Sequence, residues 1–299
     1  GSSPDDGAFT IIKDFKAASA DGFVSLSEQI RVEGDATFLG NPVDIAFEPE
    51  EMIIYIAERA NGGGRVLGFA MPAMSGNYMP TYNDLFAGAS AVYLSSDNGI
   101  GTPNPSTPDV ADRFFVSSNN QRVIATYNIQ DDNSIMKQQF TNANMDADGI
   151  YYDEAADVLY QLNRNNGAVA AYSNFRSGGS PNLSAMSAAE TINGREIAVS
   201  GNRLVVAQDA NDANGNQNRL IVFEISPTAI TLVARYDVDF NLWGIHVDGE
   251  TLYAIEDNSN RLAVFNNFFF LPEGKINPTR SIEVEGIVRT HGLTYVADR

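Results

Sequence analysis

The chain has 299 residues, 43% of them hydrophobic, and its 38 Asp and Glu against 19 Lys and Arg give a net charge of -19. This composition is that of a folded globular protein and not of a disordered one. The absence of cysteine excludes disulfides and thiolate metal sites. The acidic balance disfavours nucleic acid as a partner, and no apolar run approaches the length of a membrane span.

A hairpin signal recurs along the chain. In residues 252–265, two runs of alternating apolar residues flank a turn rich in Asp, Asn and Ser. A further short strand is expected before and after each such hairpin, and four strands at a period near 50 residues are typical of a β-propeller blade. The same pattern returns at residues 54–69, 114–125, 159–172 and 204–223.

Counting the second strand of each unit predicts the number of blades. The anchor residues of these strands are Tyr55, Phe115, Tyr160, Val205, Tyr253 and Tyr295. We therefore expect an all-β, six-bladed propeller with four antiparallel strands per blade, in a single domain over residues 1–299. An open array of β-sandwiches, or two β domains, is the alternative.

The two ends of the chain complement each other in this scheme. The last unit stops after its expected second strand, whereas residues 8–12 and 27–33 at the start resemble a third and a fourth strand. The sequence Ile-Arg-Val-Glu-Gly at 30–34 also matches Ile-Glu-Val-Glu-Gly at 282–286. The expected last blade thus takes two strands from each terminus, which would leave no exposed sheet edge.

The hairpins resemble those of NHL-type propellers, in which Tyr-Val-Ala-Asp followed by Asn-Asn-Arg and Val-Phe marks each blade. The matching stretches are residues 54–59, 260–265 and 293–299. This resemblance implies a propeller that serves as an interaction module. Residues 148–153 are similar to six-bladed gluconolactonase-like enzymes, but that family's metal-ligating residues are not found at matching positions.

Acidic and amide side chains gather in the loops that share one face of the predicted propeller. A ring of such oxygens at the mouth of the channel suits a hard cation such as Ca²⁺, although Asp and Asn also form turns without any ligand. The candidate ligand-binding residues at the mouth are Asp44, Asp148, Asp239, His246 and Asp257. A separate loop metal site, or else a flexible turn, is expected at Asp209, Asn211, Asp212 and Asn214.

The chain has two histidines and one tryptophan. His246 is expected on a first strand, facing the channel, and His291 on the opposite side of its blade. Trp243 is expected to line or plug the channel. Two separate histidines argue against a His-based zinc site, and no Gly-x-Ser-x-Gly elbow indicates a serine hydrolase.

These features favour a non-enzymatic propeller that binds a protein or glycan partner, with or without a structural Ca²⁺. The alternative is a divalent-metal-dependent hydrolase or lactonase at the channel mouth that uses Asp44, Asp148, Asp239 or His246. The chain begins with a polar stretch, so the expected location, extracellular or periplasmic, assumes that a leader was removed. Apolar residues 268–270 would form either a partner-binding patch or packing between blades.

Overall fold

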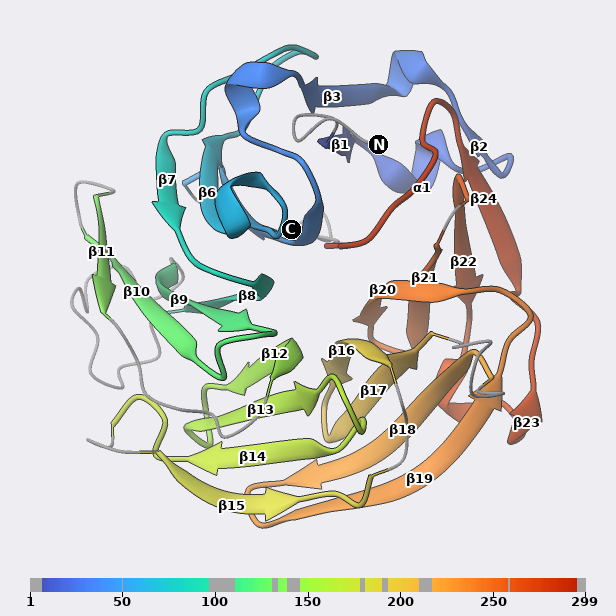
Figure 1. Cartoon of the computed structure of the whole chain (residues 1–299). Helices are drawn as coiled ribbons and strands as arrows, with labels where there is room; N and C mark the ends of the chain where they lie inside the picture. The colour runs from blue at the N-terminus through green and yellow to red at the C-terminus, as the bar shows by residue number, and fades with distance from the viewer. Residues whose placement is uncertain are drawn as a thin grey trace.

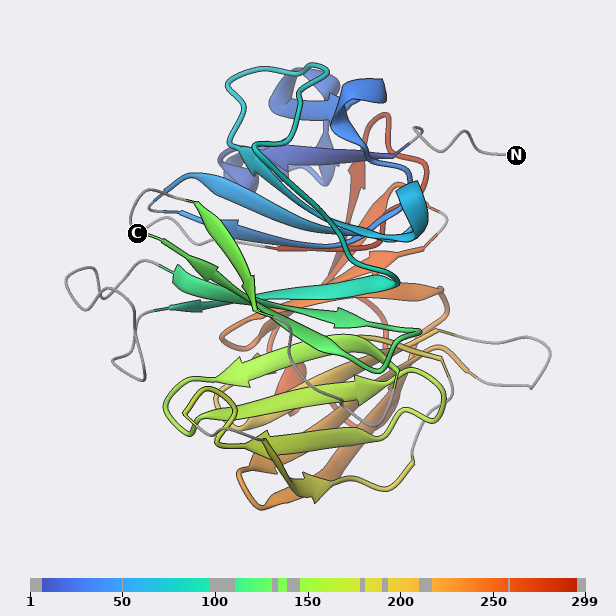
Figure 2. The same ribbon diagram turned by 60° about the vertical axis from the view of Figure 1, so that its left-hand side comes forward.

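The computed structural model describes residues 7–49, 51–96, 111–130, 134–138, 146–177, 181–189, 193–209, 217–257 and 259–294. Antiparallel sheets follow one another around a central axis in chain order (Figures 1 and 2). Blade 1 contains β4 (Pro42–Glu48), β5 (Ile53–Glu58), β6 (Arg65–Ala70) and β7 (Tyr82–Leu85). Blade 2 contains β8 (Ala89–Ser96), β9 (Ala111–Ser118), β10 (Ile124–Ile129) and β11 (Ile135–Gln138).

The remaining blades repeat this plan, and two of them gain a fifth, parallel strand at their outer edge. Blade 3 contains β12 (Ala147–Asp153), β13 (Val158–Asn163), β14 (Val169–Ser173) and β15 (Asn182–Met186). Blade 4 contains β16 (Gly194–Ser200), β17 (Arg203–Gln208), β18 (Arg219–Ser226), β19 (Ala229–Asp237) and β23 (Gly274–Lys275). Blade 5 contains β20 (Leu242–Asp248), β21 (Thr251–Glu256), β22 (Arg261–Phe265), β24 (Arg280–Val284) and β2 (Phe23–Val24).

The fold is therefore an all-β propeller, as the sequence predicts. The five anchor residues from Tyr55 to Tyr253 all lie on the second strands, namely β5, β9, β13, β17 and β21, and the sixth, Tyr295, lies outside the described residues. The first strands face the axis, and each contacts the first strand of the next blade from β4 round to β20. No described helix is long and apolar enough to cross a membrane.

The part of the ring between blades 5 and 1 differs from the expected sixth blade. Among the described residues its sheet has two strands, β1 (Ala8–Ile12) and β3 (Gln29–Glu33), both from the N-terminal part of the chain. Between these strands lie α1 (Phe15–Ala18), the strand β2 of blade 5, and the 3-10 turn η1 (Leu26–Glu28). The described residues thus form five blades of four or five strands, and six complete blades are not confirmed.

The C-terminal segment, residues 285–294, passes between blade 5 and blade 1 without forming a strand. A Cβ added at Gly244 of β20 would lie 2.1 Å from the carbonyl oxygen of His291. A Cβ at Gly292 would lie 2.5 Å from the Cα of Asp44 on β4. The segment therefore lies against the innermost strands of both neighbouring blades, and only glycine allows so close an approach.

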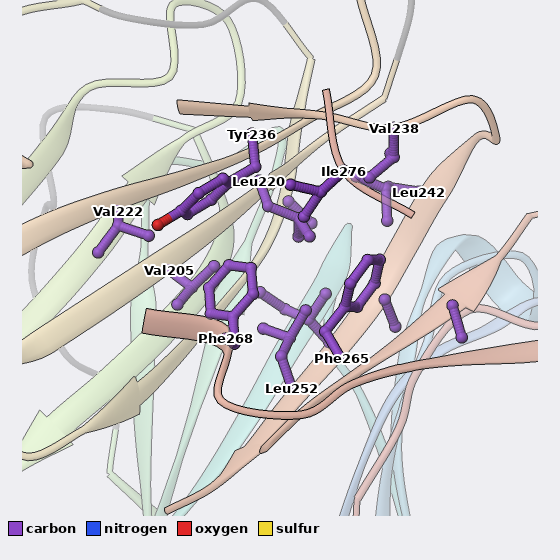
Figure 3. Packing of buried hydrophobic residues seen from close by; sticks show 14 of the residues in the cluster. Val205, Leu220, Val222, Tyr236, Val238, Leu242, Leu252, Phe265, Phe268 and Ile276 are labelled. Atoms are coloured by element: carbon purple, nitrogen blue, oxygen red, sulfur yellow. The ribbon is translucent and has the colours of Figure 1, made fainter. Parts of the chain in front are cut away.

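The apolar core fills the spaces between neighbouring blades. Between blades 4 and 5, Tyr236 and Phe268 pack with ring centroids 5.0 Å apart (Figure 3). Phe268 begins the 3-10 turn η5 (Phe268–Phe270) and is fully buried, whereas Phe270 is 73% exposed. Residues 268–270 are therefore mainly an inter-blade plug, and burial of one such phenylalanine stabilises the fold by about 1.5–3 kcal/mol.

Candidate functional site

An irregularity at the start of each innermost strand shapes the channel mouth. A β-bulge leaves one residue of the strand unpaired and re-aims its side chain. The register shifts fall between Pro42 and Asp44, Ala89 and Ala91, Ala147 and Gly149, Gly194 and Glu196, and Leu242 and Ile245. The residues in the bulges are therefore Val43, Ser90, Asp148, Arg195, and Trp243 with Gly244.

A second set of side chains follows directly after the second strand of each blade. The backbone N–H of each of these residues donates to a carbonyl just before the bulge, so the five positions are equivalent. The donors are Arg59, Asn119, Arg164, Asp209 and Asp257, and the acceptors are Asn41, Gly88, Asp146, Asn193 and Asn241. Both sets thus belong to the same end of the blades.

We use the name mouth ring for the charged and polar residues that these positions bring together, with two from the C-terminal segment. The ring comprises Arg59, Ser90, Asp148, Arg164, Arg195, Asp209, Trp243, Asp257, Arg289 and His291.

Asp148 is the acceptor at the centre of one half of the ring. Its Oδ1 atom accepts a hydrogen bond from Ser90 Oγ at 2.6 Å and another from Arg59 Nη2 at 3.1 Å. Its Oδ2 atom lies 3.7 Å from Nε of Arg164. The carboxylate is only 2% exposed, and the two guanidinium groups offset much of the cost of burying its charge.

In the other half of the ring, the indole of Trp243 contacts two arginines. The guanidinium carbon of Arg195 lies 4.2 Å from the indole centroid, and that of Arg289 lies 5.8 Å from it. Arg195 also pairs with Asp209 at 2.9 Å, and Arg289 with Asp257 at 3.1 Å. Cation–π contacts combined with ion pairs hold both guanidinium groups beside one aromatic ring.

His291 stacks on the same indole, with ring centroids 4.0 Å apart. Its Nδ1 atom lies 3.2 Å from the carbonyl oxygen of Pro42, which fixes Nδ1 as the donor in the neutral imidazole. Its buried Nε2 atom has no hydrogen-bond partner among the described residues and lies 3.8 Å from Oδ1 of Asp257. Burial, and next the positive charge of Arg289, lower the pKa of His291 to about 4. The imidazole is therefore neutral at pH 7, and its buried Nε2 lone pair accepts no hydrogen bond from a described group.

Two further carboxyl groups lie one residue past a bulge, on β4 and β16. Asp44 accepts hydrogen bonds from the N–H groups of Val92 at 2.7 Å and Ile45 at 2.8 Å. Burial nevertheless raises the pKa of Asp44 to about 7, because these two bonds offset the cost of desolvation only in part. Burial, and next the charge of Asp44, raise the pKa of Glu196 well above its ordinary value. These two groups therefore retain protons that exposed carboxyl groups would lose.

The residues predicted for the site are spread over several environments. Asp148 and Asp257 belong to the mouth ring, and Asp44 lies beside it, against Gly292. Asp239 is 69% exposed and pairs with Lys275 of β23 at 2.7 Å. His246 lies three residues after Trp243 on β20, opposite Tyr253, and burial lowers its pKa.

The predicted metal loop is only partly described. Asp209 belongs to the mouth ring, where it pairs with Arg195, while Asn211, Asp212 and Asn214 lie outside the described residues. Within the described ranges, no three His, Cys, Asp or Glu side chains are grouped so that they could hold a metal ion.

Sequence reasoning missed the four arginines and placed His291 on the wrong side of its blade. The sequence does contain a signal for the bulge positions. In blades 1, 4 and 5, the bulge residue comes two residues after an asparagine whose carbonyl group accepts the mouth N–H, namely Asn41, Asn193 and Asn241. Aligning the blades on that asparagine predicts that Arg195 and Trp243 occupy equivalent positions in their blades.

Two surface cavities lie away from the ring, both between blades 1 and 2. One has a volume of about 330 Å³ and is lined by Tyr55, Tyr82 and Ile135 among others. The other has a volume of about 210 Å³ and is lined by Phe86 and Lys137 among others. No mouth-ring residue lines either cavity, and neither gathers charged groups as the ring does.

Comparison with known proteins identifies the fold of this chain but not a family to which it belongs. No family model and no curated protein sequence matches the chain. Among solved structures, the periplasmic gluconolactonase of Pseudomonas aeruginosa is similar, with a TM-score of 0.59, 14% identity and coverage of 86% of this chain and 74% of that one. A candidate 6-phosphogluconolactonase of Bacteroides uniformis gives a TM-score of 0.54, 15% identity and coverage of 85% and 73%.

A structure of a nidogen/laminin complex is also similar, with a TM-score of 0.62, 11% identity and coverage of 89% of this chain and 88% of that one. Propellers named as lactonases and propellers in protein complexes therefore share this architecture. At these identities the likeness shows the propeller fold alone.

Proposed function

We propose that the protein is a hydrolase that opens a cyclic ester, a lactone, at the mouth ring. The observation that carries this proposal is the placement of His291. Its neutral imidazole has a buried Nε2 lone pair that accepts no hydrogen bond from a described group, and it shares the ring of Trp243 with Arg195 and Arg289. The names of two structural neighbours, a gluconolactonase and a candidate 6-phosphogluconolactonase, agree with this chemistry.

In the proposed reaction, Nε2 of His291 accepts a proton from water while the water oxygen attacks the carbonyl carbon of the lactone. The guanidinium groups of Arg195 and Arg289 stabilise the negative charge that develops on the carbonyl oxygen. Collapse of the tetrahedral intermediate breaks the bond to the ring oxygen, which takes the proton back from the imidazolium. Asp257, 3.8 Å from Nε2, stabilises the imidazolium while it exists.

The proposal assigns to arginine the role that a divalent cation has in the alternative expected from the sequence. The ring carboxylates Asp148, Asp209 and Asp257 are each paired with a guanidinium group. Carboxylates held in this way are poor candidates for a shared cation, since the ion would have to displace the arginines.

A second candidate is a binding module for a protein or glycan, without turnover, exported to the cell surface or periplasm. The observation that favours it is apolar surface on the connection between β6 and β7, where Met74 is 66% exposed and Met79 is 72% exposed. Exposed apolar side chains grouped on one loop are typical of contact surfaces. A Ca²⁺ ion in the loop after Asp209 would be compatible with either function.

We also propose that the part of the ring between blades 5 and 1 is a reduced sixth blade, of the NHL type. One repeated contact supports this view. Gly149 lies against Glu196 of the next blade, and Gly292 lies in the same way against Asp44. By this correspondence the C-terminal segment takes the place of an innermost strand, and His291 takes the place of a bulge residue.

The two histidines provide a matched test of the function. We expect wild-type protein to hydrolyse at least one member of a panel of sugar-acid lactones, followed by acid release in a pH-stat with spontaneous hydrolysis subtracted. His291→Gln should lower kcat/KM by about 10²–10⁴-fold, since it removes the general base, whereas His246→Gln should leave it nearly unchanged. Dialysis against a chelator should have no effect.

Two outcomes would contradict the proposal. One is that wild-type protein hydrolyses no lactone of the panel, which would favour the binding module. The other is an equal loss of activity in both histidine variants, which would mean that the general base lies elsewhere. Circular dichroism and the melting temperature of each variant show whether it has folded.

A further inference from the structure

We infer that the mouth ring selects an anion, so that its ligand carries a carboxylate or phosphate group. This inference rests on the proposed function, which makes the mouth ring the active site, but the observations that support it are different ones. The chain has a net charge of -19 and only 15 arginines, and four of them, Arg59, Arg164, Arg195 and Arg289, belong to one ring. A concentration of cations in an acidic protein marks the place where an anion is attracted.

The charges of the ring do not cancel. Three of its carboxylates, Asp148, Asp209 and Asp257, face four guanidinium groups. Burial lowers the pKa of Arg59, the negative charge of Asp148 raises it, and the positive charges of Arg164 and Arg195 lower it again, so Arg59 has two cationic neighbours besides its aspartate. A bound anion would relieve this repulsion, whereas a neutral ligand would not.

The ring also contains hydrogen-bond donors that have no acceptor among the described residues. The Nε atoms of Arg59 and Arg195 are buried and have no hydrogen-bond partner in the described part of the chain. Each guanidinium group uses its Nη2 atom on an aspartate. Leaving such a donor without an acceptor costs about 1–3 kcal/mol, so an oxygen-rich anion is the ligand that stabilises these groups most.

The chemistry of arginine narrows the class of ligand further. A guanidinium group is planar and matches the paired oxygens of a carboxylate or a phosphate. Arg289 is the most exposed arginine of the ring, since its side chain is 53% exposed, against 34% for Arg164, 18% for Arg59 and 12% for Arg195. We therefore expect an anion to reach Arg289 first and then the buried donors.

The experiment uses Trp243, which is the only tryptophan of the chain and lies in the ring. Its fluorescence, excited selectively over tyrosine, reports on the surroundings of Arg195 and His291. The protein is titrated with D-glucuronate, with inorganic phosphate and with the neutral methyl glucoside. We expect a saturable change with at least one of the two anions and none with the neutral sugar, and the stronger of the two responses identifies the preferred anionic group.

Arg289→Gln should weaken that binding by about tenfold or more. Its side chain is largely exposed, so the variant is expected to fold. Arg219→Gln is the matched control, because Arg219 forms an ion pair with Asp237 on the outer strands of blade 4. The control should bind as the wild type does. Isothermal calorimetry with the same three compounds covers the case in which binding leaves the fluorescence unchanged.

The inference is overturned if neither method detects either anion, if the neutral sugar binds as tightly, or if Arg219→Gln loses as much affinity as Arg289→Gln. These outcomes are independent of turnover. Anion binding without hydrolysis of any lactone would support the inference and contradict the proposed enzyme. Hydrolysis of neutral lactones without anion binding would support the proposed enzyme and contradict the inference.

Discussion

The mouth ring and the core between blades 4 and 5 are both buried, but they are built in opposite ways. In the core, regular alternation along β18, β21 and β22 places apolar side chains against η5, and Phe268 is fully enclosed (Figure 3). In the ring, bulges break that alternation and bring Asp148, Arg195 and Trp243 toward the axis. The regular parts of the strands therefore form the apolar core, and the bulges at the strand starts position the charged residues of the mouth ring.

The difference also appears in the hydrogen bonding. In the ring, buried polar atoms such as Nε of Arg195 and Nε2 of His291 have no hydrogen-bond partner among the described residues. The core has few polar atoms to satisfy, and Tyr236 there donates its hydroxyl to the carbonyl oxygen of Leu271 at 3.2 Å. Buried polar atoms of this kind need a partner, which water, an ion or a ligand can supply.

The largest expected effect on stability is in the core. Phe268→Ala should lower the free energy of unfolding by about 3–5 kcal/mol, because it removes a fully buried ring and leaves a cavity. Phe270→Ala, which alters an exposed ring two residues away, should change it by less than about 0.5 kcal/mol. Chemical denaturation measures the free energy of unfolding of the two variants. Equal decreases in the two would show that Phe268 is not the residue that stabilises the packing between blades 4 and 5.

A smaller loss of stability is expected in the ring. Asp148→Asn removes the charge that Arg59 and Arg164 face, and should cost about 1.5–3 kcal/mol. Asp239→Asn breaks an exposed pair with Lys275, so its cost should stay below about 1 kcal/mol. If both variants unfold at the same denaturant concentration, the ring is not a buried ion-pair network.

Asp44 should make stability depend on pH. Its pKa is about 7 in the folded protein and 3.8 ordinarily, so the folded state holds the proton more tightly than the unfolded chain between these values. The free energy of unfolding should therefore fall as the pH rises from about 4 to 7 and then level off. In Asp44→Asn the fall should be smaller, because only Glu196 and Asp209, whose pKa values burial also raises, then contribute in that direction. Melting temperatures across this range measure the slope, and an unchanged slope would mean that Asp44 is ionised in the fold.

The sequence predicts the blades better than it predicts the ring. Alternating apolar residues around Tyr55 or Tyr160, followed by Asn- and Gly-rich turns, depend on local physics alone, and they locate the hairpins. Arg195 and His291 lie some 96 residues apart in the chain and meet only through Trp243. Their meeting depends on the bulges and on the path of the C-terminal segment between two blades, and neither follows from periodicity.

The same distinction explains the acidic residues. Asp148 and Asp239 both follow an expected turn and look alike in the sequence, but one is 2% exposed and the other 69%. Asp148 lies in a bulge beside two arginines, whereas Asp239 lies outside the bulge of its neighbour β20. Residue type and turn context therefore indicated which face carries the charges, but not which charges face the axis.

The pH dependence of kcat/KM tests the central claim most directly, because the pKa values of His291 and of the neighbouring Asp44 are well separated. If His291 is the base, its pKa of about 4 leaves it neutral above that value, and kcat/KM should be constant between about pH 5 and pH 8 once spontaneous hydrolysis is subtracted. If kcat/KM instead rises with a midpoint near pH 7, the ionisation of Asp44 controls the reaction. That result would contradict the assignment of His291.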